Sequence, residues 1–186
     1  THILATVESK LPSEKMKEGY NAAAVKAEKK SDFAQAYRYY DKAENTVAIG
    51  ALYQKIFENF APNNLDLLLT ITEETNTKQN SRAAQTVYAV LKQPKLLGFS
   101  RDIPRRLMAM VSEHKLTLTT SQDDLLKDAL VSKLALYELQ GMIHNDKNLP
   151  LRWAKFHATS SPKDAYAVFK SRKYQGPEIN AAVQQG

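Results

Sequence analysis

We expect an all-α fold of seven to eight helices, packed as antiparallel hairpins in a bundle or in a short layer of helical repeats. Three observations predict it. Only 6 of the 186 residues are glycine, and most of the 7 prolines stand between segments whose apolar residues recur at helical spacing. Ser, Asp or Asn precedes several of these segments, as is typical of helix N-caps. Because each helix has a single apolar face, the helices must pack against one another.

The composition is that of a folded domain, with 43% hydrophobic and 25% charged residues. There is no apolar run near the roughly 20 residues that cross a bilayer. The absence of cysteine excludes disulfides, thiolate nucleophiles, cysteine-bound zinc and iron–sulfur clusters. It fits a reducing compartment, so we expect a cytoplasmic protein. The chain begins with Thr1 and no leader, which suggests one domain of a larger protein.

The first two predicted helices lie in residues 13–60. The first runs from near Ser13 to about Lys30, and its inner face comprises Met16, Tyr20, Ala23 and Ala27. Ser31 and Asp32 supply the next N-cap. The stripe that follows comprises Phe33, Ala36, Tyr37, Tyr40 and Ala43, and it continues, with a kink at Gly50, through Ile49, Leu52, Tyr53, Ile56 and Phe60. The turn sequence "APNN" ends this helix.

Three further helices are expected before residue 114. Asn64 can cap a third, "LDLLLTITEETN", although the β-branched residues of this segment are also compatible with a strand. Asn80 or Ser81 can cap a fourth, whose inner face comprises Ala84, Val87, Tyr88 and Leu91. After the connector "KQPKLLGFSRD", Pro104 suits the first turn of a fifth.

The C-terminal part begins with "KLTLTTS", whose alternation indicates an extended segment. Ser121 and Asp124 then form a capping box that opens a long helix, "QDDLLKDALVSKLALYELQGMI". "HNDKNLP" interrupts the chain, and a final helix follows from Pro162 to about Tyr174. We therefore expect a helical core in residues 1–145 and a basic segment in 146–186 packed on it, or a single domain.

Aromatic and small residues alternate in residues 17–50. Tyr20, Ala23 and Ala24 lie on the first helix, and Phe33, Ala36, Tyr40 and Ala43 on the second. With these residues the segment resembles one helical hairpin of the tetratricopeptide type, which implies an interaction scaffold. Ala27 stands where that family has an aromatic residue, and no second copy follows 34 residues on. The alternative is therefore that residues 17–50 form a generic antiparallel helix pair.

No catalytic motif stands out. The four histidines have no zinc-binding spacing. We expect His114 to be solvent-exposed at the end of a helix. Asp123 and Asp124 are read as compensation of a helix dipole. His157 and Thr159 resemble the opening element of ADP-ribosyltransferase folds, where a strand histidine contacts the nicotinamide nucleotide. That family needs a long β-rich segment afterwards, and only residues 158–186 follow, so we expect no enzyme, no cofactor and no metal.

Positive charge gathers in the C-terminal half. Residues 1–93 carry 12 basic and 11 acidic side chains, and residues 94–186 carry 14 and 9. Between residues 147 and 173 seven basic residues accompany one acid, Asp164, and alternate with aromatics. If they converge with a cluster near residue 101, they would form a pocket for an anion. The candidate contacts are Arg101, Arg105, Arg106, Arg152, Lys155, Lys163, Lys170, Arg172 and Lys173. The alternative is a set of solvated charges around a core of Trp153, Phe156, Ala165 and Phe169.

These patterns favour a non-catalytic helical interaction module that binds a protein partner or an anionic ligand through its basic C-terminal surface. Tyr39, off the apolar stripe, is the candidate protein contact in the N-terminal part. Two alternatives remain: a module that binds phosphoinositides at an anionic membrane, where the protein would be peripheral, and a small enzyme with an unrecognised site. Nucleic acid is the least favoured partner, because no recognition motif accompanies the charge.

Overall fold

The computed structural model describes residues 2–75, 81–143 and 146–172, and within them it is all-helical, with ten α-helices and no strand. The expected fold class is confirmed, with more helices than the seven to eight predicted. The chain divides into two compact units, residues 1–78 and 79–186. No helix in the described ranges is long and apolar enough to cross a membrane.

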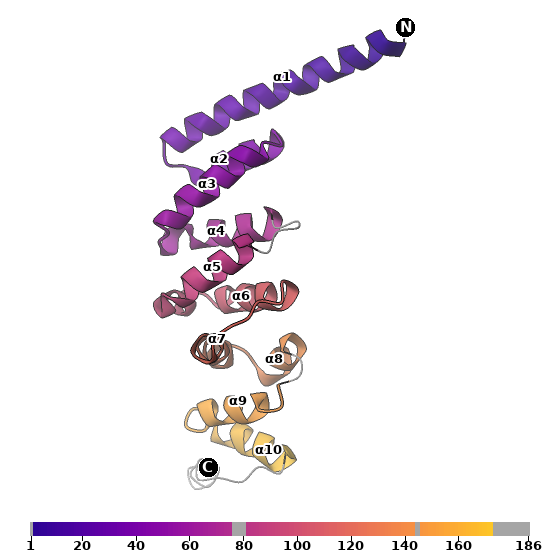
Figure 1. Ribbon diagram of the computed structural model, residues 1–186. Coiled ribbons are helices and arrows are strands. Elements are labelled where there is room, and N and C mark those ends of the chain that lie inside the picture. Colours follow the sequence, from indigo (N-terminus) through magenta and orange to yellow (C-terminus); the bar gives the residue numbers. More distant parts are fainter. Residues whose placement is uncertain (1, 76–80, 144–145, 173–186) are drawn as a thin grey trace. The chain divides into compact units, whose positions relative to one another are not determined.

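Unit 1 contains α1 (His2–Lys29), α2 (Phe33–Lys42), α3 (Thr46–Glu58) and α4 (Pro62–Thr75), and each of these helices packs on the next (Figure 1). Small residues bring α1 and α2 together, since Ala24 and Ala36 are fully buried and Tyr40 fills the space beside them. The leucine-rich segment predicted as helix or strand is the helix α4, whose buried residues are Leu65, Leu68, Leu69, Ile71 and Thr72.

The first two helices differ from the prediction in four ways. The first helix begins at His2 rather than near Ser13. Met16, expected on its inner face, is 58% exposed, because α2 packs on the end of α1 that carries Ala24 and Ala27. The second predicted helix is two helices, separated at Glu44, whose φ of 54° is left-handed. Gly50, the expected kink, lies inside α3.

Unit 2 contains α5 (Ser81–Leu91), a 3-10 turn (Pro94–Gly98), α6 (Asp102–Glu113), α7 (Thr120–Lys133), α8 (Leu136–Met142), α9 (Leu149–His157) and α10 (Pro162–Arg172). Again the helices pack mainly on their sequence neighbours, and α7 also contacts α9. Figure 1 shows these elements from rose to yellow. The boundary expected between residues 145 and 146 therefore lies inside a compact unit, whereas the division of the chain falls at 78/79.

The long C-terminal helix of the prediction is also two helices. Leu134 and Ala135 are extended, which ends α7 and starts α8. The N-cap of α7 is Thr119, which forms a capping box with Gln122, two residues before the predicted Ser121 and Asp124. Asn64 likewise lies inside α4 and accepts the main-chain N–H of Ala61. The predicted caps at Asn80 and Ser81 lie outside the described side chains.

Candidate functional site

A small core joins the C-terminal helices α9 and α10 to each other, and two ring hydrogen bonds join α9 to the end of α7. Ala154, Ala165 and Phe169 are buried at their contact. On the side toward α7, the indole N–H of Trp153 donates to the Leu134 carbonyl oxygen at 3.2 Å. The Nε2 of His157, one turn further along, lies 2.9 Å from the Val131 carbonyl oxygen. A carbonyl can only accept, so this Nε2 carries the hydrogen, and both rings satisfy carbonyl groups at the end of α7.

His157 therefore lies at the end of a helix and not on a strand, which removes the geometry on which the ADP-ribosyltransferase resemblance depends. His114 ends α6 with its side chain only 13% exposed, so it is not the solvated residue we expected. Across the described residues, no group of three His, Cys, Asp or Glu side chains could hold a metal ion.

A second set of contacts between α7 and α9 is ionic. The guanidinium of Arg152 donates to Asp124 at 2.8 Å and to Asp128 at 2.9 Å. Lys127 of α7 binds Asp146, just before α9, at 2.8 Å, and Asp123 at 2.9 Å. Burial alone would raise the pKa of Asp146, but hydrogen bonds from Lys127 and from the Asn148 main chain outweigh it, and its pKa lies below the ordinary value.

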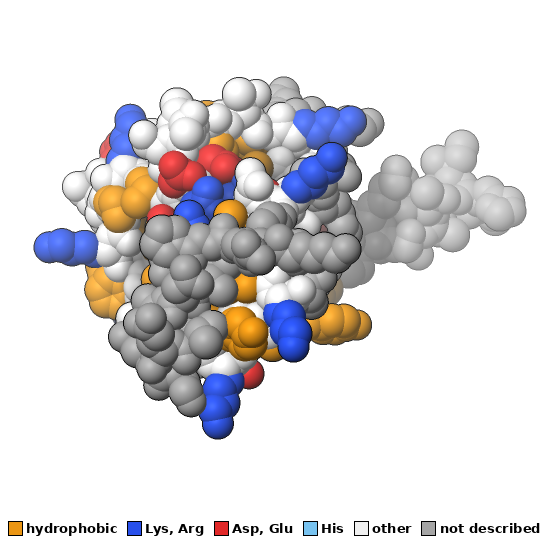
Figure 2. All heavy atoms as spheres, turned by 90° about the horizontal axis from the view of Figure 1, so that it is seen from below, with side chains coloured by type: hydrophobic (Ala, Val, Ile, Leu, Met, Phe, Trp, Pro, Cys, Tyr) orange, Lys and Arg blue, Asp and Glu red, His pale blue; other side chains and the backbone are white. Residues whose placement is uncertain are grey.

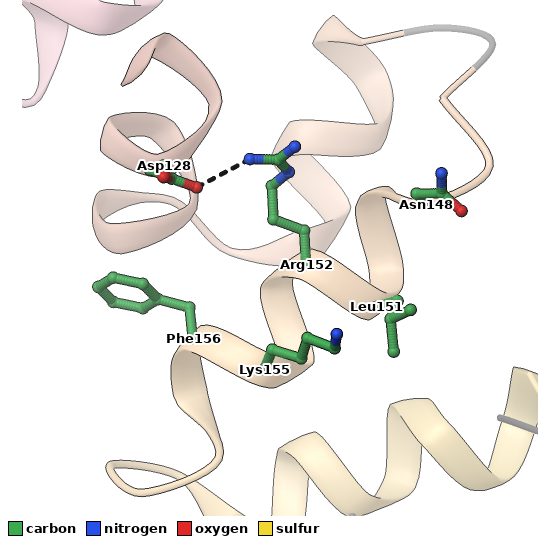
Figure 3. Close-up of a pocket in the computed structure, with 6 residues that line it drawn as sticks. All are labelled: Asp128, Asn148, Leu151, Arg152, Lys155 and Phe156. Carbon is green, nitrogen blue, oxygen red and sulfur yellow. Dashed lines mark hydrogen bonds and ion pairs between the residues drawn. The ribbon is translucent and has the colours of Figure 1, made fainter. Parts of the chain in front are cut away.

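A groove of about 690 Å³ opens beside these contacts (Figure 3). Asp128 of α7 lines one side, and the rest is lined by one face of α9. We call this the α9 face; it comprises Asn148, Leu151, Arg152, Lys155 and Phe156. Figure 3 shows Arg152 reaching toward Asp128, with Phe156 and Leu151 at opposite ends of this stretch of α9. Lys155 and Phe156 are exposed, and Phe156 retains 50% of its accessible surface.

The predicted basic residues do not form one open anion pocket. Arg101, the N-cap residue of α6, and Arg105 within α6 both bind Glu138 of α8, at 2.7 and 2.9 Å. Arg152 is held by the two aspartates of α7, and Arg106 is half-buried with contacts of its own. Arg101, Arg105 and Arg152 therefore bind acidic side chains of the chain itself, which the spacing of basic residues alone could not indicate.

Three predicted lysines are exposed, and we call them the α9–α10 lysines: Lys155, Lys163 and Lys170. Lys163 and Lys170 are seven residues apart on α10, so they share a helix face, and Tyr166, 39% exposed, lies between them. Figure 2 views the molecule from the side on which α9 and α10 lie. The basic side chains, in blue, stand apart from one another there and do not form one patch. The side chain of Arg172 and all of Lys173 lie outside the described part.

The N-terminal candidate, Tyr39, is half-buried and stacks on Tyr20 of α1 with ring centroids 6.3 Å apart. It therefore helps to join α1 and α2. Unit 1 has its own polar pocket of about 380 Å³ between α2 and α4, where the hydroxyl of the buried Tyr37 donates to Glu74. Burial and this hydrogen bond raise the pKa of Tyr37.

Sequence reasoning missed Phe156 as a surface residue. The sequence places it in the core only in the alternative of solvated charges, together with Trp153, Ala165 and Phe169, whereas half of its surface is exposed. Its signal was present in the helical spacing: Phe156 is two residues from the buried Ala154, a separation that turns a side chain to the far side of a helix.

Comparison with known proteins gives no match, since no family model fits the chain and no curated protein or solved structure is significantly similar to it. The tetratricopeptide-like hairpin of residues 17–50 therefore stays a prediction, and function has to be argued from the geometry alone.

Proposed function

We propose that this chain is a non-catalytic helical interaction module that binds a protein partner through the surface of α9 and α10. The observation that carries the proposal is the α9 face, where the exposed Phe156 and the half-buried Leu151 line a groove together with the exposed Lys155. Exposed apolar side chains beside charged ones are typical of protein-binding sites.

The neighbouring helix supports the same proposal. The exposed face of α10 carries Lys163, Tyr166 and Lys170, so basic side chains again accompany an aromatic one. Tyrosine is enriched at protein interfaces, because its ring gives contact area and its hydroxyl can hydrogen-bond. The rigid attachment of α9 to α7 through Trp153 and His157 would present this surface with little loss of entropy on binding.

The test is capture of partners from cytosol with the intact chain. One bait carries Lys155→Glu, Lys163→Glu and Lys170→Glu. The matched control carries Lys15→Glu, Lys26→Glu and Lys29→Glu, three exposed lysines of α1, and has the same change in net charge. We expect the natural chain and the α1 control to retain the same partner and the α9–α10 bait to lose it. Equal capture by all three baits would overturn the proposal.

A second candidate function, binding to an anionic membrane, is favoured by the exposed Phe156 and Tyr166 beside the α9–α10 lysines, because aromatic side chains insert at lipid interfaces. It has less support, because Arg101, Arg105 and Arg152 already bind acidic side chains of the chain. Flotation with vesicles containing phosphoinositides tests it: the natural chain should float and the α9–α10 variant should not, whereas indifference to lipid composition would exclude it.

A further inference from the structure

The break between α7 and α8 falls where the local sequence favours a continuous helix. Residues 133–136 read "KLAL", and Lys, Leu and Ala are among the strongest helix formers. Glycine and proline are absent there, yet Leu134 and Ala135 are extended, with ψ angles of 149° and 151°, and two separate helices result (Figure 1). Contacts from outside this segment must therefore hold the break, because its own residues favour a helix.

The break removes four main-chain hydrogen bonds. In a continuous helix the N–H groups of residues 135–138 would bond the carbonyls of residues 131–134. These bonds cannot form while Leu134 and Ala135 are extended. Ala135 is the N-cap of α8 and has no side-chain oxygen that could accept one of the freed N–H groups. The sequence of the segment therefore offers no local replacement for the lost bonds.

Two side chains of α9 supply part of the replacement. The imidazole Nε2 of His157 donates to the Val131 carbonyl oxygen at 2.9 Å, and the indole N–H of Trp153 donates to the Leu134 carbonyl oxygen at 3.2 Å. These carbonyls are the first and the last of the four that the break frees. In a continuous helix a main-chain N–H would compete for each of them, so docked α9 stabilises the broken conformation.

Ion pairs hold α8 in its separate position. Glu138 of α8 binds Arg101 at 2.7 Å and Arg105 at 2.9 Å. At the end of α7, the ammonium of Lys133 donates to the Gly98 carbonyl oxygen at 3.2 Å. All of these partners lie far away in the sequence, so they act as tertiary contacts on a segment whose local preference is different.

A continuous helix and docked α9 exclude each other, because the connection between α8 and α9 is short. Lys127 of α7 binds Asp146 and also Asp123, so its ammonium lies toward the start of α7. In a continuous helix Met142 would lie 15 residues beyond Lys127, or about 22 Å along the axis. The four residue steps from Met142 to Asp146 span at most about 14 Å. Asp146 could not reach Lys127, and α9 would leave its place on α7.

We propose that residues 120–142 form a two-state element that α9 controls. While α9 is docked on α7, the segment is broken at Leu134 and Ala135. When α9 leaves, α7 and α8 join into one helix, whose four added main-chain hydrogen bonds offset the contacts that are lost. A ligand that binds docked α9 favours the broken state, and one that binds α9 away from α7 favours the continuous helix.

Two changes move this element in opposite directions. Trp153→Phe with His157→Phe keeps two rings on α9 and removes both donors. Ala135→Pro locks the break, because the φ of −67° at Ala135 suits proline, the extended Leu134 suits the position before it, and proline interrupts a continuous helix. NMR of the intact chain reports the state through the Cα shifts of residues 134 and 135 and the hydrogen exchange of amides 135–138.

We expect extended Cα shifts at residues 134 and 135 of the natural chain, with rapid exchange of amides 135–138. In the double variant the shifts should become helical and these amides should exchange at least about tenfold more slowly, because they gain main-chain acceptors. Adding Ala135→Pro to the double variant should restore the extended shift at residue 134. Circular dichroism confirms that each variant is folded.

Extended shifts at residues 134 and 135 in the double variant would overturn the proposal, whether α9 is docked or released. If the double variant does not fold, single proline variants decide. Ala135→Pro should unfold thermally at the same temperature as the natural chain or higher, whereas Ala129→Pro, inside α7, should unfold at a much lower one. Strong destabilisation by Ala135→Pro would show that the break is not the native conformation and would also overturn the proposal.

Discussion

The imidazole Nε2 of His157 donates a hydrogen bond to the main-chain carbonyl oxygen of Val131 at 2.9 Å. The imidazole also packs on the indole of Trp153, with ring centroids 4.5 Å apart. Together with the Trp153 hydrogen bond to Leu134, this contact sets how α9 lies on α7. The position of the α9 face depends on these contacts of His157 and Trp153.

We expect His157→Ala to lower the free energy of unfolding by about 1–2 kcal/mol, because the carbonyl of Val131 loses its partner in a half-buried site. His157→Gln, which keeps an N–H donor, should recover part of the loss. Denaturant unfolding measures both. Wild-type stability in His157→Ala would mean that this hydrogen bond does not hold α9.

The ion pair of Lys127 and Asp146 should give unfolding a dependence on acidic pH. The pKa of Asp146 is lowered in the fold, so its contribution to stability is present above its ordinary pKa of 3.8 and is lost as the pH falls through the lower folded value. We expect Asp146→Asn to cost about 1 kcal/mol at pH 7. That difference from the natural chain should shrink below about pH 4.

Chemical unfolding at several pH values measures this effect, with Asp164→Asn, a change at an exposed carboxylate, as the control. A difference between Asp146→Asn and the natural chain that stays constant as the pH falls well below 3.8 would contradict the assigned role, because protonation of Asp146 removes its ion pair with Lys127.

The N-cap of α7 is Thr119 in the structure, whereas the sequence predicts Ser121. Thr119→Ala should cost about 1 kcal/mol, because the side chain accepts the Gln122 main-chain N–H, whereas Ser121→Ala should change stability by less than about 0.5 kcal/mol. Thermal unfolding of the two variants decides between the two caps, and a larger loss in Ser121→Ala would restore the predicted one.

Lys115 offers a stabilising substitution. It follows the last turn of α6 with φ 51°, a left-handed conformation that costs roughly 1 kcal/mol for a residue with a Cβ atom. Lys115→Gly should raise the free energy of unfolding by about 0.5–1 kcal/mol, while Lys115→Ala, which keeps the Cβ atom, should not. A destabilised glycine variant would show that the lysine side chain contributes more than its backbone conformation costs.

The sequence predicted the helices where the signal is local. Apolar residues at helical spacing suffice to indicate α10, and they indicate α2 and α3 as one longer helix, whereas the β-branched residues of the α4 segment left a strand possible. The breaks were missed because the residues that make them are unusual for the purpose. Glu44 adopts the left-handed conformation that glycine usually supplies, and Leu134 with Ala135 ends α7 without glycine or proline.

The candidate site was predicted in part, since Arg152 and Lys155 both line the groove. The sequence could not predict that these arginines form ion pairs within the chain, because their partners are far away in sequence. Arg101 and the Glu138 that it binds are 37 residues apart. The exposure of Phe156 likewise depends on which helices cover α9. The spacing within α9 indicates only the side of the helix to which its side chain points.

Site-specific photo-crosslinking tests the central claim most directly. A photoreactive phenylalanine analogue replaces Phe156 in the groove in one chain and Tyr137 of α8, which is 87% exposed, in the other. Both chains are irradiated in cytosol and the adducts are identified by mass spectrometry. We predict a discrete protein adduct at position 156 that is absent at position 137 and is lost when Lys155→Glu is added. The same adducts at both positions, or none at 156 while the chain still captures a partner, would contradict binding through the α9 face.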